Sequence, residues 1–295
     1  MDLLYTILDM DNGGIVSSHS KKSPVDYPKR TNMEKVKVKI EVELEIKNGK
    51  VILPAGTTQP MGFNNARKCC RNLTSIEIPD SVTKIGKKAF EDCSSLTNVK
   101  MPSSIKEIGS YSFSGCTSLS SIDIPNSVIK IGEGAFCLCT ELTNIVIPDS
   151  VKEIKDSTFA RCSRLTNIMI PSSVTKIGNY SFRECTSLKS VVIPKSVIEI
   201  GDSAFSHCSS LTSIKIPDSV KRIGSCAFED CSGLKSIEFS NSVMELGDNV
   251  FSCSTSKGQR IPYGTALQEI IVPTGTTEKF KKLLDKKLHH LIVEK

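Results

Sequence analysis

One 23-residue phrase recurs along most of this 295-residue chain, and it is clearest as LTSIKIPDSVKRIGSCAFEDCSG from Leu211 to Gly233. Two residue types keep the same 23-residue step: phenylalanine at Phe90, Phe113, Phe136, Phe159, Phe182, Phe205, Phe228 and Phe251, and cysteine at Cys70, Cys93, Cys116, Cys139, Cys162, Cys185, Cys208 and Cys231. A fixed period of this length is the signature of a stacked solenoid. Because a solenoid grows by adding coils, the repeat overrides the two globular domains that the length alone would permit.

The inward positions recur from coil to coil, and in the first coil, taken as the model, they are Leu73, Ile76, Ile78, Val82, Ile85, Ala89, Phe90 and Cys93. Pro79 ends the first strand because proline has no N–H to give to a β-ladder, and Gly86 permits a tight bend. Ala89 and Phe90 fit a helical or 3₁₀ turn. No coil can bury its apolar face alone, so we predict a repeat solenoid of short parallel strands joined by 3₁₀ or helical turns.

We divide the chain into a flexible leader at residues 1–34, a capping hairpin with a degenerate coil at 35–72, eight repeats at 73–256 and a C-terminal cap at 257–295. Residues 35–46 alternate strictly between charged and apolar side chains, which is the period of a strand with one dry face. The pair Asn48-Gly49 then favours a type I′ turn. We therefore expect an N-terminal hairpin cap in which this strand pairs with residues 51–53.

The C-terminal segment predicts a cap of a different kind. Residues 267–273 (LQEIIVP) repeat the strand phrase once more. One helical face then carries Phe280, Leu283, Leu284 and Leu288. We expect a terminal helix from about Thr277 to Leu288.

The phrase LTSIxIPxSVxxIGxxAFxxCSS, from Leu73 to about Ser254, resembles the repeat of BspA-like leucine-rich repeat proteins, and the closing IIVPTGTTEKFKKLL is similar to C-terminal caps of that family. The resemblance implies a right-handed leucine-rich-repeat solenoid with strands on one face. It also implies a surface or secreted molecule of bacteria or protozoa that binds host, matrix or neighbouring-cell proteins. The start MDLLYTILDM departs from a secretory signal, because it has no basic n-region and acidic residues interrupt its apolar run. A cytoplasmic location is the alternative.

Charge and hydropathy argue against nucleic acid and membranes as partners. The formal net charge is +6, and the basic residues are scattered or gathered in the C-terminal tail, whereas nucleic-acid binders concentrate them on a surface with aromatic residues between them. No stretch approaches the roughly 18 apolar residues of a membrane span. We expect no nucleic acid, no membrane span and a monomeric protein that binds a protein ligand.

The spacing of the twelve cysteines argues against both a structural zinc site and a disulfide framework. Structural zinc sites use close pairs such as C-x₂₋₄-C, and the chain has no two matched pairs. Cysteines that repeat with the coil would stack at about 4.8 Å, where parallel Cβ atoms lie beyond the usual disulfide range. We interpret them as buried free thiols that pack as small hydrophobic residues. Cys137, Cys226 and Cys253 lie off this column and could be more exposed.

No reaction centre is visible in the sequence. His207 precedes Cys208 and is the one candidate for a nucleophile pair, but adjacent residues in a turn point apart and the cysteine is expected to face the core. No Ser/His/Asp grouping, phosphate-binding glycine loop or acid pair stands out. We predict no catalytic residue, no metal and no cofactor.

The outward residue between the two strand isoleucines varies from coil to coil, and it reads Glu77, Lys100, Asp123, Val146, Met169, Val192, Lys215 and Glu238. We call this set the outer column. Its neighbouring outward position is small and polar throughout: Ser75, Asn98, Ser121, Asn144, Asn167, Ser190, Ser213 and Ser236. An apolar centre with a polar rim is how protein interfaces are built. Our hypothesis is a protein-binding face with Val146, Met169 and Val192 at its centre and with Lys100, Asp123, Lys215 and Glu238 as its rim. The alternative is that β-forming residues vary freely on an exposed strand.

The repeat glycine is replaced once, by Lys155. If the bend needs positive φ, a lysine there is strained; otherwise the bend widens.

The function that these features predict is a non-enzymatic solenoid that binds a protein through its strand face, of the surface-adhesion kind that the resemblance implies. The alternative is an intracellular scaffold for protein–protein interactions, favoured by the missing export signal and the many cysteines.

Overall fold

The structure is a computed structural model. It describes residues 71–252 and 266–295 in full, together with the backbone of the short strands at 4–9, 14–16, 40–44, 50–52, 253–254 and 260–261.

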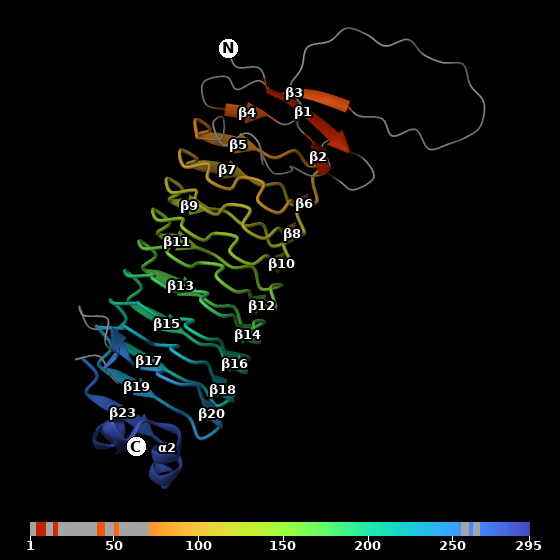
Figure 1. The fold of residues 1–295 in the computed structure, drawn as a ribbon. Coiled ribbons are helices and arrows are strands. Elements are labelled where there is room, and N and C mark those ends of the chain that lie inside the picture. The colour runs from red at the N-terminus through yellow and green to blue at the C-terminus, as the bar shows by residue number, and fades with distance from the viewer. Residues whose placement is uncertain are drawn as a thin grey trace, which may run out of the picture.

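Each coil contributes two short strands, and strands of the same kind stack on one another in two columns (Figure 1). The first column contains β5 (Ser75–Glu77), β7 (Asn98–Lys100), β9 (Ser121–Ile122), β11 (Asn144–Ile145), β13 (Asn167–Met169), β15 (Ser190–Val192), β17 (Ser213–Lys215) and β19 (Ser236–Glu238). The second contains β6 (Lys84–Ile85), β8 (Glu107–Ile108), β10 (Lys130–Ile131), β12 (Glu153–Ile154), β14 (Lys176–Ile177), β16 (Glu199–Ile200), β18 (Arg222–Ile223) and β20 (Glu245–Leu246). The pairs within these columns are parallel, as between β13 and β15. The predicted solenoid of short parallel strands is confirmed.

The inward positions form one continuous core along the stack. All eight predicted inward residues of the first coil are buried, from Leu73 to Cys93. The phenylalanine rings of neighbouring coils are stacked, with centroids 5.2 to 5.9 Å apart. Because burying one such ring contributes about 1.5–3 kcal/mol, stability rests on this stacking.

The segment around each phenylalanine is a series of turns, which corrects the expected 3₁₀ or helical turn. In each of the first seven coils two residues take positive φ, and in the first coil they are Lys88 and Asp92, both at 60°. A right-handed helix excludes such values. This backbone directs alternate N–H groups to the next coil, as when Phe90 donates to the Ser112 carbonyl at 2.7 Å. Bonds between coils therefore outcompete a local helix here.

The repeat glycine allows neighbouring coils to approach each other, and it does not supply positive φ. A Cβ added to Gly109 would lie 2.7 Å from the backbone of Gly86, although the φ of Gly109 is ordinary. Lys155 also has no positive φ, so it is not strained in that sense. Instead, the second column divides into two sheets at this coil, β6-β8-β10 and β12-β14-β16-β18-β20. The side chain of Lys155 is accommodated by a break between β10 and β12.

The two strands expected to form a hairpin are present, but they join different sheets. β3 (Ile40–Leu44) pairs antiparallel with β1 (Leu4–Asp9), which also pairs with β2 (Gly14–Val16). β4 (Lys50–Ile52) pairs parallel with β5 and begins the first column. The expected pairing is corrected because the edge of β5 offers β4 a partner in register. β1 and β2 also differ from the flexible leader expected for this region, while the expected turn at 48–49 lies outside the described residues.

The C-terminal cap contains the expected strand and a shorter helix than predicted. β23 (Glu269–Val272) continues the first column after β19. α2 (Thr277–Leu283) is followed by a 3₁₀ helix, η1 (Lys286–Leu291), and by β24 (Ile292–Glu294), which adds to β23 in parallel. The helix ends early because Leu284 has extended backbone and Asp285 caps η1 by accepting from the Lys287 N–H. A short antiparallel pair, β21 (Cys253–Ser254) and β22 (Arg260–Ile261), precedes the cap.

Candidate functional site

The three apolar residues of the outer column are neighbours on adjacent strands. Val146 is bridged to Met169, and Met169 pairs with Val192 in the β13–β15 register. Their exposed fractions are 66%, 80% and 77%, while the isoleucines beside them are buried. The strand alternation that buries one side of each strand therefore presents these three side chains to solvent.

The charged residues predicted as a rim flank this apolar centre on both sides. Lys100 bonds to Glu77 and Lys215 bonds to Glu238, each at 2.5 Å. These hydrogen bonds are the main cause of the raised pKa of both lysines. Asp123 is exposed and makes no hydrogen bond or ion pair with any residue that the structure describes.

The small outward residues beside the outer column leave its centre open. Asn144, Asn167 and Ser190 are all exposed, and each lies two residues before a member of the apolar trio. Short polar side chains of this kind allow another surface to approach the backbone closely. The site can therefore offer an apolar contact to another surface.

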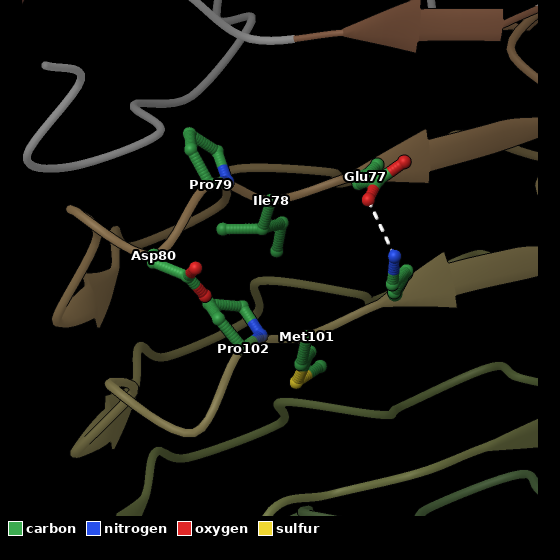
Figure 2. Close-up of a pocket in the computed structure, with 7 residues that line it drawn as sticks. Glu77, Ile78, Pro79, Asp80, Met101 and Pro102 are labelled. Atoms are coloured by element: carbon green, nitrogen blue, oxygen red, sulfur yellow. Dashed lines mark hydrogen bonds and ion pairs between the residues drawn. The ribbon is translucent and has the colours of Figure 1, made fainter. Parts of the chain in front are cut away.

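A pocket lies at one end of the outer column, where β5 and β7 end and the chain continues into the following turns (Figure 2). Its volume is about 250 Å³, and it is lined by Glu77, Ile78, Pro79, Asp80, Lys100, Met101 and Pro102. Two of the lining residues, Lys100 and Glu77, are joined by a hydrogen bond. Pockets for small molecules are usually about 300–1,000 Å³, so this hollow is a weak candidate for a cofactor or substrate.

The second column carries a charge pattern that the sequence reasoning missed. Its outward strand residues alternate in sign along the whole stack: Lys84, Glu107, Lys130, Glu153, Lys176, Glu199, Arg222 and Glu245. Glu107 contacts Lys84 at 3.1 Å and Lys130 at 2.8 Å, and Arg222 contacts Glu199 and Glu245 at 3.0 Å each. Reading this column coil by coil would have revealed the alternation.

The outward charges of the second column thus neutralise one another through ion pairs within the chain. Burial raises the pKa of Glu107, but the hydrogen bonds from Lys130 and Lys84 outweigh that effect and bring the pKa below its ordinary value. At the coil where the second column divides, Glu153 instead contacts Lys155 at 2.7 Å. A face occupied by its own ion pairs has less to offer a partner than the apolar outer column.

The repeated cysteines form a ladder of buried thiols above the first coil. Each thiol donates to the carbonyl of a phenylalanine in the preceding coil, as Cys139 does to Phe113 at 3.2 Å. The members of the ladder are Cys116, Cys139, Cys162, Cys185, Cys208 and Cys231. Burial raises the pKa of Cys185 and Cys231 to about 12. These thiols are therefore hydrogen-bond donors as well as the small hydrophobic groups that were predicted.

Cys93 departs from the predicted row of free thiols because it is disulfide-bonded. It is the first described cysteine of the repeat, so its bond leaves the six thiols above it in register. Cys137 and Cys226 are half-buried and are not in disulfides, and burial raises the pKa of Cys137. The side chain of Cys253 and the whole of Cys70 lie outside the described residues.

The structure does not arrange His207 and Cys208 as a nucleophile and base. The Cys208 thiol is buried and donates to the Phe182 carbonyl at 3.2 Å, and burial raises its pKa well above the ordinary value. His207 Nδ1 instead lies 3.6 Å from a carboxylate oxygen of Asp230.

Across the described part of the chain, no three His, Cys, Asp or Glu side chains are grouped to hold a metal ion. No helix found there has both the length and the apolar character for crossing a bilayer.

The comparison with known families decides the identity of the repeat. The model of the BspA type leucine rich repeat region matches six copies, over residues 63–189 and 152–271. The chain belongs to this family.

Solved structures of other leucine-rich repeat proteins are similar to this BspA-type chain. A leucine rich repeat protein of T. pallidum is 27% identical with a TM-score of 0.51, over 80% of this chain and 88% of that one. A leucine rich cell surface protein of Faecalibacterium prausnitzii is 25% identical with a TM-score of 0.47, over 84% and 76%. The pneumococcal vaccine antigen PcpA is 19% identical with a TM-score of 0.45, over 75% and 66%. Among curated proteins, none matches the chain.

Proposed function

We propose that this BspA-type protein is a non-enzymatic binding solenoid that recognises a protein through the apolar centre of its outer column. One observation carries the proposal: Val146, Met169 and Val192 are adjacent on neighbouring strands and are largely exposed. Other large apolar residues are also exposed, such as Ile129, Ile198 and Met244, but they lie in coils that are not adjacent to one another. A contiguous apolar centre with a charged rim is the arrangement of a protein interface.

The biological setting we propose is adhesion at a cell surface, which the family resemblance supports. An intracellular scaffold would use the same face, so the binding site is common to both functions. Treating intact producing cells with external protease separates them. Loss of the protein while cytoplasmic markers survive supports the surface role, and full protection supports the scaffold.

Met169→Glu tests the binding face, and Met244→Glu is its matched control. Met169 and Met244 are 80% and 71% exposed, and both lie on or beside short strands of the repeat, but in different columns. Because hot-spot residues near the centre of an interface each carry about 2 kcal/mol or more, Met169→Glu should weaken binding to extracellular proteins at least tenfold. Neither change should alter the melting temperature. Equal binding by both variants and the unmodified protein would place the site elsewhere.

A further inference from the structure

From Lys100 to Glu238, the charges of the outer column are arranged so that this face complements itself. Counting coils from Met169, Asp123 lies two coils to one side and Lys215 two coils to the other. Lys100 and Glu238 lie three coils away on opposite sides. At both distances the two charges have opposite sign. One coil away on each side the residue is valine, so the apolar centre is also symmetric about Met169.

We propose that the partner of this face is a second copy of the same chain, packed face to face with its coils in reverse order. The inference rests on the proposed function and names the occupant of that site. Symmetric dimers use the same patch on both copies, so such a patch must be complementary to itself. This replaces the expectation that the protein is monomeric.

The sign pattern selects one of two possible two-fold axes. An axis parallel to the strands and passing over Met169 reverses the order of coils. It places Asp123 opposite the second copy's Lys215 and Lys100 opposite the second copy's Glu238. An axis parallel to the stack would instead place every residue opposite itself and set like charges against each other. Because both copies have the same spacing between coils, about 4.8 Å, the reversed arrangement stays in register over its length.

The apolar centre fits the same arrangement. Val146 would face the second copy's Val192, and the two Met169 side chains would meet on the axis. The small neighbouring residues Asn144, Asn167 and Ser190 are exposed and short enough for the two faces to approach. Met169 is 80% exposed and has a flexible, polarisable side chain that adapts to such a contact.

The second copy would supply an oppositely charged partner for Asp123. Lys100 and Lys215 already bond to Glu77 and Glu238 within the chain, but Asp123 has no ionic or hydrogen-bonding partner among the described residues. In the reversed dimer it lies opposite a lysine. Lys215 can then contact one carboxylate in its own chain and one in the second copy.

The size of the face predicts weak self-association. The outer column is long but only one or two side chains wide, so the dimer would bury less than the standard area of about 800 Å² per partner. We therefore expect a dissociation constant between about 1 µM and 1 mM. Contacts of this strength become effective when many copies are presented together, as on a cell surface.

Sedimentation equilibrium of the full chain from micromolar to millimolar concentration tests the dimer. The unmodified protein should approach a dimer. Met169→Glu places two carboxylates on the axis and should weaken association at least tenfold, while Met244→Glu should leave it unchanged. Melting temperatures measured alongside confirm that each variant is folded.

Charge reversal tests the order of the coils. Asp123→Lys alone sets the introduced lysine against the second copy's Lys215, and Lys215→Asp alone sets two aspartates against each other, so each variant should associate roughly tenfold more weakly than the unmodified protein. A mixture of the two variants restores both opposite-charge pairs, because the introduced lysine of one variant faces the introduced aspartate of the other. The mixture should therefore form a heterodimer about as strong as the unmodified dimer.

Three outcomes would overturn the second-copy proposal. They are a monomer at every concentration, a dimer that Met169→Glu does not weaken, and single charge reversals that are not rescued by mixing. The protein could instead stay monomeric while Met169→Glu abolishes binding of an extracellular protein that the Met244→Glu variant still binds. In that case the proposed function stands and the partner is a different protein. If Met169→Glu changes neither measurement, both proposals fail.

Discussion

Gly201 lies where two neighbouring coils approach each other closely, and its replacement by alanine tests why the repeat needs glycine. The φ of Gly201 is not positive, so alanine can adopt the same backbone conformation. At a site with room, Gly→Ala would stabilise the protein by about 0.4–1 kcal/mol, because it restricts the unfolded chain. The structure predicts the opposite sign.

The magnitude follows from the contacts that a new Cβ would make. It would lie 2.7 Å from Asn179 N and 2.7 Å from Gly178 C, at least 0.7 Å inside the 3.4 Å at which ordinary contact begins. Relief requires the coils to separate, which strains the bonds from Gly201 N to Ile177 O and from Asp202 N to Asn179 Oδ1, each 2.8 Å long. Overpacking of this kind usually costs about 1–3 kcal/mol. We expect Gly201→Ala to lower the free energy of unfolding by that amount.

Equilibrium urea unfolding followed by circular dichroism measures this difference, since the chain has no tryptophan for fluorescence. Lys155→Ala is the matched control, because the second column is already broken at that coil and a side chain is accommodated there. It removes only the partly exposed contact with Glu153, and we expect a change of about 0–1 kcal/mol. A Gly201→Ala protein that is as stable as the unmodified one, or more stable, would refute the close-approach explanation.

Three further predictions concern the core and its titratable groups. Phe159→Ala should lower the free energy of unfolding by about 3–5 kcal/mol, because its ring stacks 5.8 Å from Phe136 and 5.5 Å from Phe182; a loss below about 1 kcal/mol in urea unfolding would contradict the ring stack. Burial raises the folded-state pKa of Cys185 to about 12 from an ordinary 9.0, so its stabilisation is complete below pH 9 and falls by about 1.4 kcal/mol per pH unit as the pH rises toward 12. Unfolding curves at pH 8 to 11 that show no such fall would count against the buried ladder. The Tyr111 hydroxyl donates to Glu133 at 2.5 Å, which raises the pKa of Tyr111 to about 12; Glu133→Gln should lower that pKa in an ultraviolet titration, and an unchanged titration would show that the bond is absent in solution.

The sequence predicts the core well because each inward position is repeated in every coil. One phenylalanine at a 23-residue step is ambiguous, but eight of them define a column, and the rings do stack along it. The buried thiols follow from the same reasoning. Periodicity therefore predicts what lies inside this protein without any knowledge of its partner.

Contacts between coils are what the sequence does not reveal. Leu138 and Arg161 take positive φ, although branched or bulky residues rarely do, because their N–H groups bond to the next coil. The pairing of β4 with β5 also depends on which segment reaches the end of the stack. The binding face is a prediction that rests on the exposure of the apolar trio.

A photo-crosslinking amino acid placed at position 169 tests the central claim most directly, with the same group at position 244 as the control. Both positions are well exposed, at 80% and 71%, so both groups can react. In cells that make the protein, position 169 should give a covalent adduct with a protein, and the adduct should be a second copy of this chain if the reversed dimer forms. Position 244 should give little. Equal labelling from both positions, or adducts from position 244 alone, would contradict the assignment of the outer column as the binding face.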